Sequence, residues 1–343
     1  MDKKALWKWL LLVVLVGGSV YTVLPLREKV RLGLDLKGGT SFTVQIDEEA
    51  VAAQLREEAK EASEATIQGR LPARLKEAQE RALEVIRNRV DGLGIAEPVI
   101  YPEKGNRIVV QLPGVDEKKR EEAARAIQSA AFLEFRLVHE KNAELVAKLF
   151  ERGLAPEGYT IVSLENMGRR REYYKRDRSA VPDEKMDAEF RAKLATFQAP
   201  HGHEFMLERE RIRGQEVYTP YFVEKRRQLS GDMLKDAGME FRSATMEPVV
   251  RLEFNATGAR KFASVTSDYA PGGARNPNPQ MGRMLAIILD GTLYSAPVIR
   301  EPIHGGRAEI SGSFTQSEAM FLANILRAGS LPAPVKIVER RVV

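Results

Sequence analysis

The feature that most constrains this chain is an uncharged run near its amino terminus. The run, residues 9–26 (WLLLVVLVGGSVYTVLPL), contains 18 residues and no Asp, Glu, Lys or Arg. As a helix it would extend roughly 27 Å, which is close to the thickness of the hydrocarbon core of a bilayer. Lys3, Lys4 and Lys8 precede it, and basic residues favour the cytoplasmic side of a membrane. We therefore expect an uncleaved anchor in the inner membrane, with the bulk of the chain on the extracytoplasmic, periplasmic side.

Two observations keep an alternative open. The small residues Gly17, Gly18 and Ser19 would suit a cleaved secretory signal, although no Ala-x-Ala site follows the apolar run. Arg27 and Lys29 lie on the far side of the run and oppose the expected orientation.

Composition limits the rest of the chain to globular structure. With 43% hydrophobic and 29% charged residues, it is neither a disordered chain nor a bundle of membrane helices. Its 343 residues are too many for one ordinary core, so we expect two or more structural units. The sequence contains no cysteine, which excludes disulfides, thiol catalysis and thiolate metal sites.

The part that follows the anchor predicts a β-α-β-β-α-β order, which is the ferredoxin-like arrangement. Gly69 and Pro72 are expected to interrupt the first helix, and proline in the first turn to start the second. Asp116 is expected to cap the third helix. The expected elements are a strand ending at residue 46, helices over 48–67 and 72–90, strands over 97–102 and 107–112, a helix over 116–130 and a strand over 132–138.

The carboxyl-terminal part predicts the same order again. Asp290-Gly291 is the strongest hairpin signal in the chain, and Gly329 is expected to end the last helix. The expected elements are strands over 247–254, 283–289, 292–299, 307–310 and 335–343, and helices over 257–267 and 315–328.

We therefore predict an α+β fold with one transmembrane helix. Two ferredoxin-like units would form a base, and the charged, weakly patterned middle would be an inserted, smaller head subdomain. The predicted division is residues 1–30 for the cytoplasmic tip and anchor, 31–139 for the first half of the base, 140–246 for the head and 247–343 for the second half of the base.

Several chemical interpretations compete with structural ones. Lys37-Gly38-Gly39-Thr40 lacks the spacing of a phosphate loop, and a strand rather than a helix follows, so the two glycines indicate a bulge or bend. His201, His203 and Glu204 could contribute to a metal site, but a solvated loop is the more common reading of such a stretch. His139 and His304 stand alone in the sequence.

Other sites are weaker still. The basic and aromatic stretch from Arg169 to Arg176 could bind single-stranded nucleic acid, yet interleaved carboxylates favour a solvated face. Asn255-Ala256-Thr257 matches a glycosylation acceptor, but capping of the following helix is the expected role. No G-x-S-x-G or other hydrolytic constellation is present in the sequence, so we expect a protein that is not an enzyme and needs no cofactor.

Five stretches together resemble the SecD family of protein translocase subunits. They occur in the family's order along residues 32–339: LGLDLKGG at 32–39, RVDGLGIAEPVI at 89–100, QLPGV at 111–115, AIILDGTLYSAPVI at 286–299, and LANILRAGSLPAPVKIVE at 322–339. The resemblance implies a membrane-anchored base that carries a mobile head. The residues that carry it, with a structural or assembly role, are Gly33, Asp35, Gly38, Gly39, Arg89, Gly94, Pro98, Pro113, Gly114, Asp290, Gly291, Pro297, Arg327, Gly329 and Pro332.

The resemblance also implies a function. The extracytoplasmic part would engage unfolded preprotein weakly and assist export driven by the proton gradient, alongside SecF, the SecYEG channel, YajC, YidC and membrane lipid. Nucleic acid is not an expected partner. Hinges would lie near residues 138–142 and 240–247.

One departure limits these expectations. Family members continue into further membrane spans that carry proton-relay carboxylates, and this sequence stops at Val343, where a second span would begin. The alternatives are an anchored envelope scaffold or assembly factor, which would bind folded partners, and an envelope enzyme, which would need a deep pocket of titratable residues.

Overall fold

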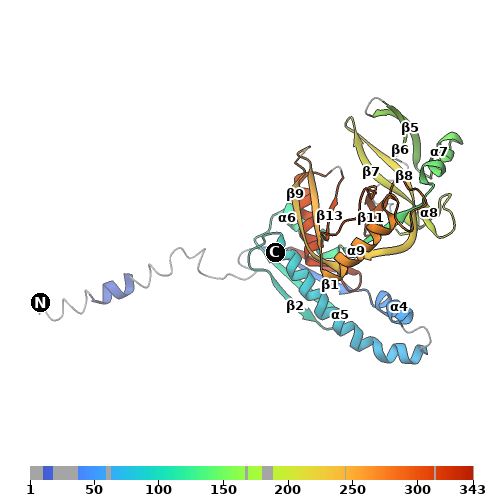
Figure 1. Ribbon diagram of the computed structural model, residues 1–343. Helices are drawn as coiled ribbons and strands as arrows, with labels where there is room; N and C mark the ends of the chain where they lie inside the picture. The colour runs from blue at the N-terminus through green and yellow to red at the C-terminus, as the bar shows by residue number, and fades with distance from the viewer. Residues whose placement is uncertain are drawn as a thin grey trace, which may run out of the picture.

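The computed structural model describes residues 11–17, 38–58, 63–166, 169–179, 188–243, 245–312 and 314–342. Within these ranges the chain is a mixed α+β protein with three antiparallel sheets (Figure 1). The expected anchor, residues 9–26, lies largely outside the described residues. Its described part, residues 11–17, is helical. No helix in the described ranges is long and apolar enough to cross a membrane.

The first sheet joins the two ends of the described chain. Its order is β14-β1-β3-β2, and every neighbouring pair is antiparallel. Phe42, Val44 and Ile46 of β1 alternate into a core against the apolar stripe of α5, because side chains two apart lie on one face of a strand. The elements of this unit are β1 (Gly39–Ile46), α4 (Glu48–Glu58), α5 (Glu64–Gly92), β2 (Val99–Glu103), β3 (Arg107–Pro113), α6 (Glu117–Gln128) and β14 (Val335–Val342).

The predicted helix boundaries at Gly69 and Pro72 are wrong. The 29-residue helix α5 passes through both, and the chain is instead divided before Ser63, whose side chain caps α5. Pro72 removes one backbone hydrogen bond, but Leu71 and Leu75 on either side of it are buried in the same core. Packing of this continuous apolar stripe therefore outweighs the local signal. The predicted Asp116 cap is confirmed.

The other two sheets share the rest of the chain. One has the order β12-β11-β4-β8-β6-β5 with β7 paired to β8, and the other has the order β13-β10-β9. Figure 1 shows β5 to β8 with α7 and α8 at one end of the molecule, and α5 with β1 and β2 at the other. The elements are β4 (Leu133–Val138), α7 (Asn142–Glu151), β5 (Tyr159–Asn166), β6 (Arg169–Arg176), α8 (Ala188–Thr196), β7 (His203–Ile212), β8 (Gln215–Ser230), β9 (Leu234–Phe241), β10 (Pro248–Phe254), α9 (Ala256–Tyr269), β11 (Leu285–Leu289), β12 (Thr292–Ser295), β13 (Arg307–Ile310) and α10 (Gln316–Ala328).

The predicted strands form, but their predicted grouping is wrong. Strand β4 does not complete the first sheet; β14 pairs with β1 there, and β4 lies between β11 and β8. The strands expected to make a second unit are divided among all three sheets. Alternation of apolar residues predicts that a strand exists, whereas its partner depends on contacts between distant segments.

The cap and hairpin predicted in the second half are confirmed. Asn255 caps α9. At the start of α10, Thr315 and Glu318 form a capping box that was not predicted. Asp290 and Gly291 have φ of 49° and 75°, as a two-residue hairpin turn requires. A second core surrounds Phe135, and a third, in the part predicted as the head, surrounds Tyr174.

Candidate functional site

Two of the stretches that resemble the SecD family meet at one end of the first sheet. Gly39 pairs with Pro113, and the Gly114 N–H donates to the Gly38 carbonyl at 2.9 Å. Gly38 and Gly114 have φ of 68° and 65°, in the left-handed region that favours glycine. Gly39 opens strand β1 and no helix begins there, so the glycines form a bend at the entry to the sheet. Gly33 and Asp35 lie outside the described residues.

Replacing Gly38 and Gly39 together by valine is expected to destabilise this end of the sheet by about 2–4 kcal/mol, because β-branched residues rarely adopt positive φ. Urea unfolding followed by circular dichroism measures the loss. The matched control is Gly17→Val, since a Cβ at Gly17 meets no atom within 4 Å. An unfolding midpoint that stays at the wild-type value in the double variant would contradict the role of the bend.

Arg89 lies at the centre of a second meeting point. Its side chain is 1% exposed. One terminal nitrogen donates to the carbonyls of Ala126, at 2.8 Å, and Ser129, and the other donates to the carbonyl of Gly329 at 2.8 Å. Burial lowers the pKa of Arg89 to about 10, and the charge of Asp290 opposes this shift, so the guanidinium remains protonated at neutral pH.

Asp290 binds the same segment from the other side. Its carboxylate accepts from the Ser129 hydroxyl at 3.0 Å and from the Ala131 and Phe132 N–H groups at 3.1 and 2.8 Å. We call Arg89, Ser129, Asp290 and Gly329 the joint. Arg89 lies on α5, Ser129 in the α6–β4 connection, Asp290 in the β11–β12 turn and Gly329 at the end of α10. The joint therefore connects the unit that contains the first sheet to the part of the chain that contains the other two sheets.

The remaining residues carried over from the resemblance do not enter the joint. Gly94 and Gly291 have positive φ, at the turn that follows α5 and in the β11–β12 hairpin. Pro98 precedes β2. The carbonyls of Pro297 and Pro332 accept from the Leu285 N–H at 2.9 Å and the Gln54 amide at 3.1 Å, and Arg327 donates to Asp236 at 3.0 Å on the surface. These residues shape turns and surface contacts.

The hairpin that contributes Asp290 to the joint also forms one wall of a groove. Gly291, Thr292, Leu293 and Tyr294 line it on that side. The groove has a volume of about 520 Å³, within the range of roughly 300–1,000 Å³ common for ligand sites. The β12 hairpin belongs to a stretch that resembles the SecD family, but nothing in the sequence indicates that α8 lies opposite it, so sequence reasoning did not find the groove.

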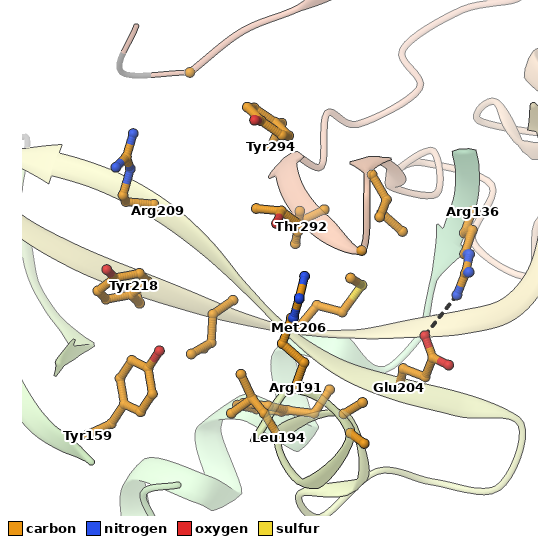
Figure 2. Close-up of a pocket in the computed structure, with 18 of the residues that line it drawn as sticks. Arg136, Tyr159, Arg191, Leu194, Glu204, Met206, Arg209, Tyr218, Thr292 and Tyr294 are labelled. Atoms are coloured by element: carbon orange, nitrogen blue, oxygen red, sulfur yellow. Dashed lines mark hydrogen bonds and ion pairs between the residues drawn. The ribbon is translucent and has the colours of Figure 1, made fainter. Parts of the chain in front are cut away.

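Figure 2 shows how three parts of the chain surround this groove. Arg191 and Leu194 rise from α8, Tyr218 and Arg209 lie on the β7–β8 side, and the β12 hairpin closes the top. The lining is largely apolar or aromatic, with a few charged groups. The full lining is Arg136, Tyr159, Arg191, Ala192, Leu194, Ala195, Glu204, Phe205, Met206, Leu207, Arg209, Tyr218, Ile288, Gly291, Thr292, Leu293, Tyr294, Gly312 and Phe314.

Beside the groove, two ion pairs hold β4 and β11 to the β7–β8 hairpin. Arg136 of β4 donates to Glu204 of β7 at 2.8 Å, the dashed contact in Figure 2. Arg283, just before β11, donates to Glu224 of β8 at 2.9 Å and to the Val138 carbonyl at 2.6 Å. The Arg136 and Arg283 side chains are 15% and 12% exposed, so solvent screens these pairs less than surface ones.

Two histidines, His139 and His203, lie at the same place as these ion pairs. We call the whole cluster the crossing; it consists of Arg136, His139, His203, Glu204, Glu224 and Arg283. The rings of His139 and His203 have centroids 4.6 Å apart, so the sequence interpretation of His139 as isolated is wrong. The Lys141 N–H donates to His139 Nδ1 at 3.0 Å, which requires that nitrogen to be unprotonated. Within the described ranges, no group of three His, Cys, Asp or Glu side chains could hold a metal ion.

Acid is expected to weaken the crossing. Burial, followed by the charges of His203 and Arg283, lowers the pKa of His139 below 6.5, while Glu140 and Glu224 oppose this. The unfolded chain therefore binds the proton more readily, so the contribution to stability is present above pH 6.5 and lost as pH falls below it. His139→Gln should reduce the loss of urea stability between neutral and acid pH, and His304→Gln should not. Identical pH profiles for His139→Gln and the wild type would refute this role.

The comparisons with known proteins agree with the blocks identified in the sequence. Residues 29–50 match the "SecD/SecF GG Motif", residues 79–140 match "Protein translocase subunit SecDF, P1 domain, N-terminal", and residues 206–333 match "SecDF, P1 head subdomain". The predicted domain boundaries stay predictions.

Whole-chain similarity extends further. The protein translocase subunit SecD of Desulfurispirillum indicum is 31% identical over 399 residues, which cover 100% of this chain and 66% of that protein. The chain thus spans about two thirds of the length of this relative. Among solved structures, SecDF in a super-membrane-facing form matches 99% of this chain and 35% of its own, with 29% identity and a TM-score of 0.54. A SecDF structure described as a membrane component that enhances protein export matches 88% of this chain and all of its own, with 26% identity and a TM-score of 0.51.

Proposed function

The chain belongs to the SecD/SecDF family of protein translocase subunits, and we propose that it assists protein export by holding unfolded polypeptide in the groove. The observation that carries this proposal is the groove itself, whose aromatic and aliphatic walls lie between α8 and the β12 hairpin. Such a surface takes apolar side chains of many shapes. The solved relative described as enhancing protein export supports the same role.

The chemistry of the groove suits a weak, unselective binder of extended chains. Leu194 and Leu207 are half-buried and offer apolar surface, and the ring centroids of Tyr294 and Phe314 lie 5.8 Å apart at one wall. Burying an apolar side chain on such surfaces is favourable by roughly 1.5–3 kcal/mol. Ordering a flexible segment offsets much of this gain. The net affinity is therefore expected to be weak, so a bound segment would dissociate quickly.

The wider setting is proposed from family membership. The chain would be anchored in the inner membrane by residues 9–26, with the part from residue 38 onward outside the cytoplasm. Its partners would be SecF, the SecYEG channel, YajC and YidC, together with the preprotein and membrane lipid. It would act without catalysis or a cofactor, and the proton gradient would drive export through membrane spans of the assembled machinery. The crossing would serve as the hinge between head and base.

Site-specific photo-crosslinking in native membranes tests this function. A benzoyl-phenylalanine at Thr292, which is exposed at the groove, should crosslink to a preprotein arrested during export. The same probe at Lys336, which is exposed on β14 and does not line the groove, is the matched control. Equal crosslinking from both positions, or crosslinks only to folded envelope proteins, would reject the proposal in favour of a scaffold.

A further inference from the structure

Two strands that line the groove each have one edge without a partner strand in the part of the chain that the structure describes. There, β7 pairs only with β8, and β12 pairs only with β11. Strands β8, β4 and β11 are paired one after another between them, so the run β7-β8-β4-β11-β12 ends in a free edge at each side. A free edge carries a row of backbone N–H and C=O groups that can pair with another chain.

The two free edges come close together because this run of strands curls. One small core receives a side chain from each of the five strands: Met206, Val223, Val138, Ile288 and Leu293. Strands β7 and β12 therefore lie close to one another, although they are at opposite ends of the run. Figure 2 shows Met206 of β7 below the β12 hairpin. The groove runs along these two edges.

The pairing of β7 with β8 determines which backbone groups of β7 are free. The turn between them is Arg213-Gly214, with φ of 50° and 79°, so Ile212 and Gln215 close the hairpin as a hydrogen-bonded pair. Before the start of β7, the Lys225 N–H donates to the Gly202 carbonyl at 2.9 Å. Hydrogen-bonded pairs alternate along antiparallel strands. The even-numbered residues of β7 therefore bond to β8, and the backbone groups of the odd-numbered residues point the other way.

Pro220 of β8 agrees with this alternation. It lies opposite Leu207 in the register of the two strands. Proline has no N–H, so it suits a position where that group would point away from the neighbouring strand. The backbone N–H and C=O groups of Phe205, Leu207 and Arg209 consequently face the free edge of β7, and all three residues line the groove.

The free edge of β7 is protected over only part of its length. Charged side chains on an edge strand are one means by which proteins prevent unwanted pairing. Residues 208–211 of β7 are all charged, whereas residues 205–207 are Phe, Met and Leu. The part of the edge without charged side chains lies in the groove.

We propose that an unfolded polypeptide binds in the groove as an added β-strand, with its backbone paired to the free edge of β7 around Leu207. This inference rests on the proposed function and adds to it the conformation of the segment that binds. Backbone pairing does not depend on side chains, so one groove can accept many sequences. The ligand is an extended segment with free amide N–H groups, and helical or proline-rich segments are disfavoured.

Fluorescence anisotropy with the full chain in detergent tests this mode of binding. The first probe is a short, labelled, apolar peptide. The second probe has the same side chains, but all its backbone amides are N-methylated, which removes the N–H donors and keeps the apolar surface. We expect the N-methylated peptide to bind roughly tenfold more weakly, because it cannot donate hydrogen bonds to the edge of β7.

A variant of β7 tests the same contact from the side of the protein. Leu207→Pro removes one N–H from the free edge, and β7 should still pair with β8 because that N–H faces away from it. Leu207→Ala is the matched control, since it also loses the leucine side chain but keeps the N–H. We expect Leu207→Pro to bind the unmodified peptide roughly fivefold to tenfold more weakly than Leu207→Ala does.

The outcomes distinguish strand pairing from the proposed function. Equal affinities of the wild type for the two peptides, or of the two folded variants for the unmodified peptide, would overturn strand pairing and leave polypeptide binding intact. Failure of both peptides to bind the wild type would overturn the proposed function itself. Circular dichroism shows whether Leu207→Pro is folded. If it is not, the two peptides on the wild-type chain decide the question.

Discussion

Replacing Arg89 by alanine is expected to lower the free energy of unfolding by about 3–5 kcal/mol. The substitution leaves the carbonyls of Ala126, Ser129 and Gly329 without the guanidinium that now binds them. It also opens a cavity, since the side chain is 1% exposed and among the largest fully buried ones. Because these carbonyls belong to separate segments, the joint between the two sheet units should loosen first.

Urea unfolding of the full chain in detergent, followed by circular dichroism, measures this effect. Arg87→Ala is the matched control on the same helix, because Arg87 is exposed and donates to the Ile100 carbonyl at the long distance of 3.5 Å. It should change stability by less than about 0.5 kcal/mol. Arg89→Lys should be intermediate, since an ammonium keeps the charge but not the planar fork of donors. Equal losses for Arg87→Ala and Arg89→Ala would show that the joint does not depend on the guanidinium.

Substituting Gly282 by alanine is expected to cost about 3 kcal/mol or more. A Cβ at this position would lie 1.7 Å from the Ile299 carbonyl oxygen, a separation at which the backbone must move. The next residue, Arg283, is hydrogen-bonded through its backbone to Tyr269 and Ile299 and through its side chain to Glu224. Displacement of this strand entry should therefore also disturb the crossing.

The matched control is Gly305→Ala. A Cβ there meets no atom within 4 Å, and the residue does not have a positive φ. Alanine at that site should be neutral or slightly stabilising, because it reduces the freedom of the unfolded chain. Hydrogen exchange of residues near Arg283 and Glu224 would report loosening of the crossing in Gly282→Ala. Wild-type stability and exchange in that variant would mean that the close approach to Ile299 can relax without cost.

Local chemistry made many elements predictable. Asp116, Asn255 and Thr315 are polar residues directly before apolar-patterned segments, and each caps the helix that follows. The Asp290-Gly291 turn forms as its residue types require. In each case the interacting groups are within a few residues of one another, so the sequence contains the whole interaction.

The wrong predictions have a common cause, which is that contacts between distant segments override the local signal. Pro72 is a strong local stop signal, yet α5 continues because Leu71 and Leu75 pack into a core built by distant strands. The sequence predicts the wrong sheet for β4, because β14, from the other end of the chain, pairs with β1. A strand's alternation does not identify its neighbour, since any apolar face can pack on any other of suitable size.

The candidate site divides in the same way. Resemblance to the SecD family identified Arg89, Asp290 and Gly329 as residues that matter, but gave no sign that Arg89 and Asp290 bind one short segment, or that Arg89 also binds the Gly329 carbonyl. The groove was not predicted at all, because α8, β7 and the β12 hairpin contribute it jointly, and the motif of the hairpin does not indicate that α8 and β7 lie opposite it. The one sequence signal for the groove was Arg136, an arginine between the apolar residues Phe135 and Leu137 in a strand.

The sequence by itself determined the family, the elements, their caps and turns, and the residues whose chemistry is unusual. Only the tertiary structure decided which strands pair, that Arg89 and Asp290 bind the same segment, and that a groove lies between α8 and the β12 hairpin. The reason is physical. Helix caps, turns and apolar periodicity act over a few residues, whereas sheet pairing, buried ion pairs and grooves depend on segments brought together by burial of surfaces far apart in the chain.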